Sequence, residues 1–280
     1  MIITAVAVGT RGDINPLAEL GEEMIRRGHE FRILTSEAFR SLIENKGVTF
    51  IKLDTDADHV MKYLVVDYKT SLDFVRGMFR LKKENPGFME QTLGAIKGSD
   101  LVMYGTCAAF ARHAAEHLNI PCARLFYSPM DPTRRYSLYS DEYDSDRVRK
   151  SYDGLPQGMN LITMIALNGW RRSVGLPGWK LNSRYTEMFG RKVLTFYPTS
   201  PLLMPPDPAW GDHIHVTGYW YHPEEAAKGY EEPEELARFL EAGEKPVFVA
   251  FGKAESPELA KLQLLTLEAL KRTGIRAIVQ

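Results

Sequence analysis

Asp13 is the residue of this chain whose type and place best suit chemistry. It ends the segment Gly9-Thr10-Arg11-Gly12-Asp13, which directly follows an apolar run over residues 2–8. A short run rich in β-branched residues is typical of a strand buried on both faces of a parallel sheet. The turn after such a strand lies at the carboxyl edge of the sheet, where α/β proteins bind ligands. Asp13 is therefore a carboxylate placed where chemistry can occur, in a turn that contains two glycines.

A structural interpretation of Asp13 stands beside the chemical one. An acidic side chain at the start of a helix can accept hydrogen bonds from the free N–H groups of the first turn. Gly9 and Gly12 would permit a tight turn and the close approach of a ligand. Arg11 has three open roles, which are to orient Asp13, to contact phosphates or to lie at the surface. The sequence alone leaves these alternatives open.

The composition is that of a globular protein without a strong charge. Of the 280 residues, 44% are hydrophobic and 25% are charged, and the formal net charge is −1. This balance provides no overall field that would attract nucleic acid. No apolar stretch reaches the roughly 18 to 20 residues of a membrane span, and no basic segment precedes the first apolar run. We therefore expect a cytoplasmic protein, with peripheral membrane contact left open.

The cysteines and histidines predict no metal or redox site. Cys107 and Cys122 lack the Cys-x-x-Cys spacing, and we expect two reduced core thiols. His113 and His117 lie one helical turn apart, as metal ligands can. No third ligand of matching spacing follows, so a solvated helix face is expected there. The Gly-x-Gly-x-x-Gly fingerprint of dinucleotide binding is also missing, which argues against a nicotinamide-dependent oxidoreductase.

Alternating strand and helix patterns predict a doubly wound parallel α/β sheet. A first helix is expected from Pro16 to Gly28, because Pro fits a first helical turn and Gly ends a helix. The other elements follow in order, with strands over 31–35, 48–53, 100–104, 121–126, 192–197 and 213–216 and helices over 37–45, 71–83, 86–97 and 108–118.

Residues 127–190 interrupt this alternation. Prolines, six tyrosines and two tryptophans crowd into the segment. A long aromatic insertion after a strand can form the wall of a hydrophobic ligand site. An accessory helical pair packed on the domain explains the same pattern equally well.

The last part of the chain predicts a second domain. Residues 221–244 are acidic and contain proline, which is typical of an interdomain linker. A strand, a turn and a helix follow over 246–251 and from about Ser256, and residues 275–279 form a further strand. We therefore assign a first Rossmann-like domain to 1–220, a linker to 221–244 and the incomplete beginning of a second Rossmann-like domain to 245–280.

These motifs together resemble a known family. Residues 9–13, Pro16-Leu17 and Arg26-Arg27-Gly28-His29-Glu30 are similar to the N-terminal signature of the sugar-nucleotide-dependent glycosyltransferases of sterols, macrolides and glycopeptides, which have the GT-B fold. The segments 216–220, 245–252 and 274–279 resemble the end of the first domain of that family and the first two strands of its second. The resemblance covers nearly the whole chain, and its motifs occur in the family's order.

The resemblance implies an activity and a division of labour. The N-terminal domain of such enzymes binds the acceptor, and the C-terminal domain binds a UDP- or dTDP-sugar. Transfer inverts the anomeric carbon and needs no metal. In the antibiotic-tailoring members an aspartate at the position of Asp13 is the general base. The expected partners are therefore a nucleotide sugar and a hydrophobic, hydroxylated small molecule, and no nucleic acid.

We assign further residues to the two sides of this expected site. The acceptor-binding residues are predicted to be Thr10, Gly12, Gly105, Phe126, Tyr127, Met130 and Tyr136, and the donor-binding residues Gly9, Arg11, Gly252 and Lys253.

Two departures from the family pattern affect the donor side. Lys253 stands where the family usually has serine, so it can meet a diphosphate or lie exposed. The family's glycine- and histidine-rich donor motif would lie beyond Gln280. We therefore expect a truncated chain that is inactive when isolated. The alternative is a non-catalytic, acceptor-binding chain that needs a separate donor-binding polypeptide.

Overall fold

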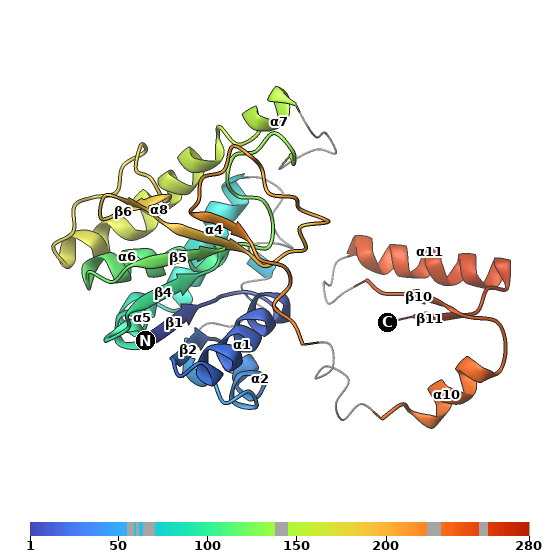
Figure 1. Ribbon diagram of the computed structural model, residues 1–280. Coiled ribbons are helices and arrows are strands. Elements are labelled where there is room, and N and C mark those ends of the chain that lie inside the picture. Colours follow the sequence, from blue (N-terminus) through green and yellow to red (C-terminus); the bar gives the residue numbers. More distant parts are fainter. Residues whose placement is uncertain are drawn as a thin grey trace. The chain divides into compact units, whose positions relative to one another are not determined.

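The computed structural model describes residues 1–54, 59, 62–63, 71–137, 145–222, 231–251 and 257–279. The chain divides into two compact units, Met1–Tyr221 and His222–Gln280, which are taken separately (Figure 1). The first unit contains β1 (Ile2–Val6), α1 (Arg11–Arg26), β2 (Glu30–Thr35), η1 (Glu37–Phe39), α2 (Arg40–Glu44), β3 (Thr49–Lys52), α4 (Ser71–Glu84), α5 (Phe88–Ile96), β4 (Leu101–Tyr104), η3 (Thr106–Ala108), α6 (Ala111–His117), β5 (Cys122–Leu125), α7 (Asp146–Lys150), α8 (Leu155–Ser173), β6 (Glu187–Met188), β7 (Arg191–Lys192), β8 (Leu194–Tyr197) and β9 (Ile214–Val216).

A parallel sheet of seven strands forms the centre of the first unit. Its order is β3-β2-β1-β4-β5-β8-β9, and every neighbouring pair is parallel. The chain winds outward from β1 in one direction through β2 and β3, and in the other direction through β4 and β5. The point where the winding reverses lies between β1 and β4, and ligands bind at the carboxyl ends of such strands. The doubly wound α/β fold predicted from the sequence is confirmed.

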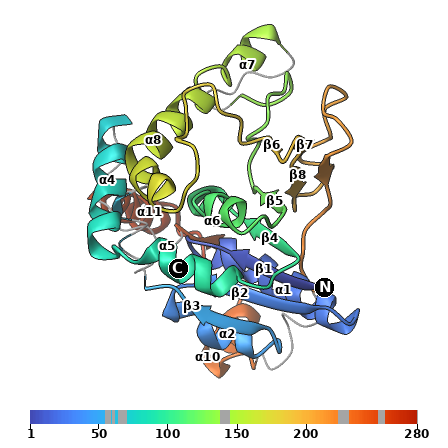
Figure 2. The ribbon, with the colours of Figure 1, turned by 90° about the vertical axis from the view of Figure 1, so that its left-hand side faces the viewer.

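Helices cover both faces of this sheet (Figure 2). On one face, Ile14 and Leu17 of α1 and Ile43 of α2 pack against β1, β2 and β5. On the other face, residues of α5, α6 and α8 pack against β1, β2 and β4, with Ala111, Ala114 and Ala115 of α6 fully buried. Small side chains on α6 let the helix approach the sheet closely. The result is a helix–sheet–helix sandwich in which β1 is buried on both sides.

Helix α1 begins at Arg11, five residues before the predicted start at Pro16. The prediction was wrong because Thr10 and Asp13 form a capping box that starts the helix earlier. Pro16 therefore lies inside the helix, where it supplies no N–H group for the main-chain oxygen of Gly12. Gly28 follows the end of the helix with a φ of 84°, as the sequence predicted for a terminating glycine.

The aromatic segment after β5 holds α7, α8 and the antiparallel β6–β7 pair. Helix α8 packs Leu167 and Trp170 against the cluster that includes α6. This part of the segment forms the accessory helices that were one of the two interpretations. Residues 138–144 lie outside the described part of the chain.

The second unit is a small strand–helix–strand structure. It contains α10 (Glu234–Glu241), β10 (Val247–Val249), α11 (Pro257–Thr273) and β11 (Ala277–Val279). Strands β10 and β11 are parallel and pair Val247 with Ala277. Phe248 is 64% exposed, and several leucines of α11 are exposed as well. The predicted strand, helix and strand are present, their assignment to a second Rossmann-like domain stays a prediction, and α10 lies within the range that was assigned to the linker.

Candidate functional site

Asp13 is the third residue of α1 and closes its first turn. Its Oδ2 atom accepts a hydrogen bond from the main-chain N–H of Thr10 at 2.7 Å and another from the Thr10 hydroxyl at 3.2 Å. The Thr10 hydroxyl in turn accepts from the N–H of Gly12 at 3.2 Å. The capping role that was one interpretation of Asp13 is therefore present. Within the described residues its second carboxylate oxygen, Oδ1, accepts no hydrogen bond, and the side chain is half-buried.

Gly9 allows Asp13 to take this position. A Cβ atom at Gly9 would lie 2.6 Å from Cγ of Asp13 and 3.2 Å from its Cβ, which is closer than real side chains pack. Gly9 is buried at the carboxyl end of β1, so the Asp13 carboxylate folds back against the strand end. The glycine predicted for the close approach of a ligand accommodates the chain's own carboxylate.

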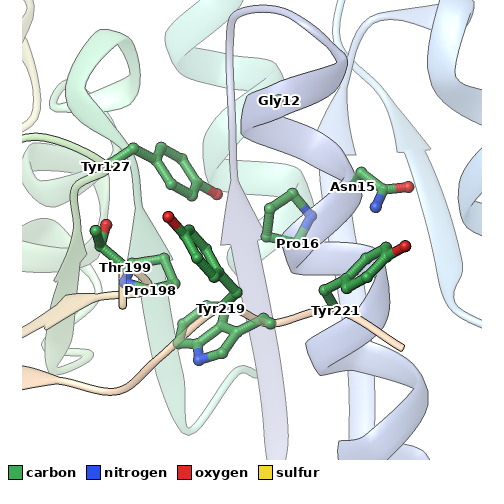
Figure 3. A pocket seen from close by; sticks show the side chains of 9 residues that line it. Gly12, Asn15, Pro16, Tyr127, Pro198, Thr199, Tyr219 and Tyr221 are labelled. Carbon is green, nitrogen blue, oxygen red and sulfur yellow. The ribbon is translucent and has the colours of Figure 1, made fainter. Parts of the chain in front are cut away.

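A pocket of about 390 Å³ opens beside this first turn (Figure 3). It is formed by the beginning of α1 and by three segments that follow β5, β8 and β9, all at the carboxyl edge of the sheet. The lining residues are Gly12, Asn15, Pro16, Tyr127, Pro198, Thr199, Tyr219, Trp220 and Tyr221. Four aromatic rings and two prolines make its walls, and Asn15 and Thr199 add polar groups. Such a lining is typical of a site for an apolar small molecule with a few polar substituents.

The segment 219–221 crosses from β9 toward α1 because of Gly218. The N–H groups of Thr217 and Gly218 donate to the main-chain oxygens of Tyr197 at 3.0 Å and Thr199 at 3.2 Å, which extends the pairing of β9 with β8. Gly218 then takes a φ of 78° that favours glycine, and the chain turns. The ring of Trp220 packs 6.3 Å from that of Phe196.

Two tyrosines of the same segment line the pocket. Tyr219 and Tyr221 are 60% and 54% exposed, and Figure 3 shows the ring of Tyr221 beside α1 and the ring of Tyr219 between Tyr127 and Pro198. Because an exposed aromatic ring gains contact area when it meets a flat apolar molecule, these rings suit the recognition of such a ligand.

Tyr127 lies opposite this segment and contacts Asp13 directly. Its hydroxyl donates to the main-chain oxygen of Asp13 at 3.0 Å. Burial raises the pKa of Tyr127, and the nearby Asp13 carboxylate raises it further. The phenol is therefore neutral at physiological pH and remains a hydrogen-bond donor.

Of the seven predicted acceptor-binding residues, the structure brings Gly12 and Tyr127 together in this pocket. Thr10 caps α1 and is exposed next to them. Gly105 follows β4, where its N–H donates to the oxygen of Val6 at 3.4 Å. Neither Thr10 nor Gly105 is among the residues that line the pocket.

Phe126, Met130 and Tyr136 lie in a separate hydrophobic cluster with Tyr197 and Met204. Phe126 is 3% exposed, so its ring belongs to the core. Met130 donates its N–H to the Tyr197 hydroxyl at 3.0 Å, and Tyr136 donates to the oxygen of Pro205 at 3.0 Å. These three residues support the loop that carries Tyr127, and an acceptor-binding role for them stays a prediction.

Two of the four predicted donor-binding residues, Gly9 and Arg11, lie in the described part of the chain. Gly9 packs against Asp13, as described above. Arg11 is exposed at the start of α1 and forms no ion pair with any described residue. Gly252 and Lys253 lie outside the described residues. Their donor-binding role stays a prediction.

Sequence reasoning missed seven of the pocket residues. They are Asn15, Pro16, Pro198, Thr199, Tyr219, Trp220 and Tyr221. The segment 216–220 was interpreted only as the end of the first domain, and residues 198–199 follow the predicted strand over 192–197. A usable signal was their common place directly after strands, because the carboxyl ends of parallel strands share one edge of the sheet.

The expectation of a solvated helix face at His113 and His117 was half wrong. His117 is exposed, but His113 is completely buried. It belongs to a group that we call the α6–α8 network, which consists of Arg112, His113, Glu116, Arg171, Trp179 and Tyr185. Its hydrogen-bond partner Arg171 belongs to α8 and is 58 positions away in the chain.

Each charge of the α6–α8 network has a partner. Arg171 donates to both carboxylate oxygens of Glu116 at 2.9 and 3.2 Å and to Nδ1 of His113 at 2.7 Å. Arg112 donates to Glu116 at 3.1 Å, and its guanidinium lies 4.8 Å from the ring centre of Trp179. Burial, together with the charges of Arg112 and Arg171, holds the pKa of His113 well below its usual value. His113 is therefore neutral, with Nδ1 as acceptor.

Among the described residues no group of three or more His, Cys, Asp or Glu side chains is arranged to hold a metal ion.

The expectation of two core thiols is correct for Cys122, which is buried, and wrong for Cys107, which is exposed. None of the described helices combines the length and the apolar character that a membrane span requires.

Several known proteins are similar to this chain in sequence or in fold. Residues 3–137 match the family described as Glycosyltransferase family 28 N-terminal domain. A sterol 3-beta-glucosyltransferase of Yarrowia lipolytica is 30% identical over 296 residues, and one of Neurospora crassa is 29% identical over 293 residues. Each alignment covers 100% of this chain but only 20% and 18% of the relative. The chain thus spans about a fifth of the length of these relatives.

Solved structures match over a larger share. The glycotransferase of kitacinnamycin has a TM-score of 0.62 at 14% identity, and the match covers 99% of this chain and 64% of that one. The spinosyn rhamnosyltransferase SpnG, complexed with thymidine diphosphate, has a TM-score of 0.55 at 16% identity, with coverages of 100% and 65%. At these identities the likeness concerns the fold.

Proposed function

We propose that this chain is the N-terminal part of a GT-B glycosyltransferase and that it binds the acceptor in an enzyme that transfers a sugar to a hydrophobic small molecule. The sugar comes from a UDP- or dTDP-sugar and goes to a hydroxyl group of the acceptor with inversion. Asp13 is the general base. The proposal covers the activity of the whole protein, of which this chain supplies the acceptor side.

One observation carries the proposal, which is the aromatic pocket beside the first turn of α1. Gly12 lines the pocket, and the next residue is Asp13. The volume of about 390 Å³ lies in the roughly 300–1,000 Å³ range of small-molecule sites. Its apolar walls favour an acceptor that is largely hydrocarbon, and the carboxylate on the residue next to Gly12 favours an acceptor that carries a hydroxyl group.

The relatives support a narrower acceptor class. Those cited above are named sterol 3-beta-glucosyltransferases, and a sterol combines a flat apolar ring system with one hydroxyl group. The exposed rings of Tyr219 and Tyr221 offer flat contact surfaces for such a molecule. A sterol, or a polycyclic molecule of similar shape, is therefore the proposed acceptor, and glucose the first sugar to test.

The chemistry assigned to Asp13 is one proton transfer. The oxygen of the acceptor hydroxyl attacks the anomeric carbon and forms the new glycosidic bond, while the bond from that carbon to the diphosphate oxygen breaks. The hydroxyl proton goes to the Asp13 carboxylate, and the nucleoside diphosphate leaves with the electron pair. The Asp13 oxygen that accepts no hydrogen bond from described residues, Oδ1, is the natural proton acceptor. The step uses no metal.

The variant Asp13→Asn separates the base role from the capping role. The amide oxygen of Asn can still accept the hydrogen bond from Thr10, so the helix start is retained, but an amide does not take up the proton. We expect turnover to fall by about 10²- to 10⁴-fold with an unchanged thermal midpoint. Glucose transfer to a sterol from UDP-glucose, followed by chromatography, measures the effect.

Asp100→Asn is the matched control. Asp100 also accepts a main-chain N–H at 2.7 Å, from Ile2 at the amino end of β1, which is the opposite edge of the sheet. It should leave turnover unchanged. Full turnover in Asp13→Asn would refute the base assignment. A protein that binds the sterol but no nucleotide sugar would instead favour the non-catalytic, acceptor-binding alternative.

A further inference from the structure

Tyr127 joins two parts of the site that are far apart in the chain. Its hydroxyl donates to the main-chain oxygen of Asp13, 114 positions away, at 3.0 Å. Its ring lines the pocket together with Gly12 and Pro16, and Figure 3 shows the hydroxyl directed toward the helix. A single side chain therefore contacts the proposed base residue and forms part of the acceptor wall.

The first turn of α1 needs support from outside the helix. Pro16 has no N–H group, so the main-chain oxygen of Gly12 lacks its usual partner four residues later. Thr10, Arg11 and Gly12 are exposed. Helix ends have fewer main-chain hydrogen bonds than helix centres and fray more easily. A hydrogen bond from Tyr127 to the third residue of the helix therefore restricts the position of Asp13.

The loop that carries Tyr127 is itself firmly held. The preceding residue, Phe126, donates its N–H to the oxygen of Phe196 at 3.1 Å. Four residues after Tyr127, the buried Asp131 carboxylate accepts from Arg124 at 2.5 Å and from the Tyr197 hydroxyl at 2.7 Å. Both contacts connect the loop to β5 and β8. Tyr127 thus connects the first turn of α1 to a loop that is held in place by the sheet.

We infer that Tyr127 is a positioning residue for the proposed sugar transfer, whose hydroxyl fixes Asp13 relative to the pocket while its ring binds the acceptor. The inference rests on the proposed function. It assigns separable effects to the two parts of the side chain. Loss of the hydroxyl should affect the reaction step, and loss of the ring should affect acceptor binding.

The variant Tyr127→Phe removes the hydroxyl and keeps the ring. Misplacement of a catalytic group lowers the rate of the reaction step, so we expect kcat to fall by roughly tenfold to a hundredfold, with the KM for acceptor within about twofold of wild type. Tyr127→Ala should in addition raise KM. Tyr152→Phe is the control, because the buried Tyr152 hydroxyl also donates to a main-chain oxygen, that of Tyr136 at 2.6 Å. It should leave kcat and KM unchanged.

Hydrogen exchange gives a second measurement that needs no substrate. In Tyr127→Phe the amides of residues 12–15 and 17 should exchange roughly tenfold faster, since one hydrogen bond that holds the turn is lost. Tyr152→Phe should not change them. The inference would be overturned if the amides of Tyr127→Phe exchanged at wild-type rates. It would also be overturned if the variant lost activity through a higher KM with an unchanged kcat. If the whole wild-type protein, with its donor side, transfers no sugar, the proposed function fails, and the exchange rates alone decide whether Tyr127 holds Asp13.

Discussion

The first turn of α1 and the α6–α8 network are both polar, and they differ in what their groups contact. In the network, Arg171 and Glu116 form a bidentate pair, and the arginine also donates to buried His113. At the first turn, Asp13 keeps one oxygen without a described partner, and the preceding residue, Gly12, lines an open pocket. Removing one partner of a buried ion pair destabilises a fold, whereas a half-buried carboxylate with an unpaired oxygen is available to a ligand. The comparison assigns stability to one region and function to the other.

The largest effect is expected from Arg171→Met. This change leaves Glu116 and His113 without their main partner in a buried environment, and breaking a buried ion pair costs about 3–5 kcal/mol. Urea denaturation should show this loss in the free energy of unfolding. Arg149→Met is the control, because its ion pair with Asp153 at 3.1 Å is exposed, and little change is expected. Equal stability of the two variants would contradict the structural role of the network.

A smaller effect is expected from Gly9→Ala, and it should lower the turnover of the enzyme. The new Cβ would lie 2.6 Å from Cγ of Asp13, so the carboxylate must move. Because a displacement of about 1 Å can cost a hundredfold in rate, turnover should fall by about that factor. Gly94→Ala is the control, since a Cβ there meets nothing within 4 Å on the exposed side of α5. Wild-type turnover in Gly9→Ala would show that the Asp13 position is unimportant.

The smallest effect is a pH dependence of stability that originates in the network. Burial and the charges of Arg112 and Arg171 depress the pKa of His113 in the folded state. Below its unfolded pKa of about 6.5, the unfolded chain binds a proton that the folded chain does not, so stability falls by up to about 1.4 kcal/mol per pH unit. Above that pH the contribution is fully present.

Unfolding curves between pH 7.5 and 5.5 measure this slope, and the unfolding data for His113→Gln provide the reference. Glutamine does not titrate and its amide oxygen can accept from Arg171. The difference in stability between the two proteins should therefore change as the pH falls below about 6.5. An identical pH dependence in both proteins would mean that His113 is protonated in the fold.

The sequence predicted the sheet well because its signals are local. Apolar runs that end at turn glycines mark buried strands, and β1 with the turn at Gly9 was found in this way. The start of α1 was missed, although Thr10 and Asp13 have the spacing of a capping box, because the proline rule was given precedence over it.

Contacts between distant parts of the chain were not predictable from the sequence. The burial of His113 depends on Arg171, and the pocket depends on segments that follow β8 and β9. Tyr127 was predicted as a site residue, but its hydrogen bond to Asp13 required the order of strands in the sheet. Local patterns therefore predicted individual site residues, and the topology was needed to group them.

The central claim is that the aromatic pocket beside Asp13 binds the acceptor. Equilibrium binding of a radiolabelled sterol, measured without nucleotide sugar, tests this claim without requiring transfer. The wild-type protein should bind saturably, and Tyr219→Ala should weaken binding by about tenfold, because an aromatic contact is worth about 0.5–1.5 kcal/mol. Phe189→Ala, which removes an exposed ring from the β6–β7 turn, should bind as wild type does. Equal sterol affinity of wild type and Tyr219→Ala, or no saturable binding, would contradict the account.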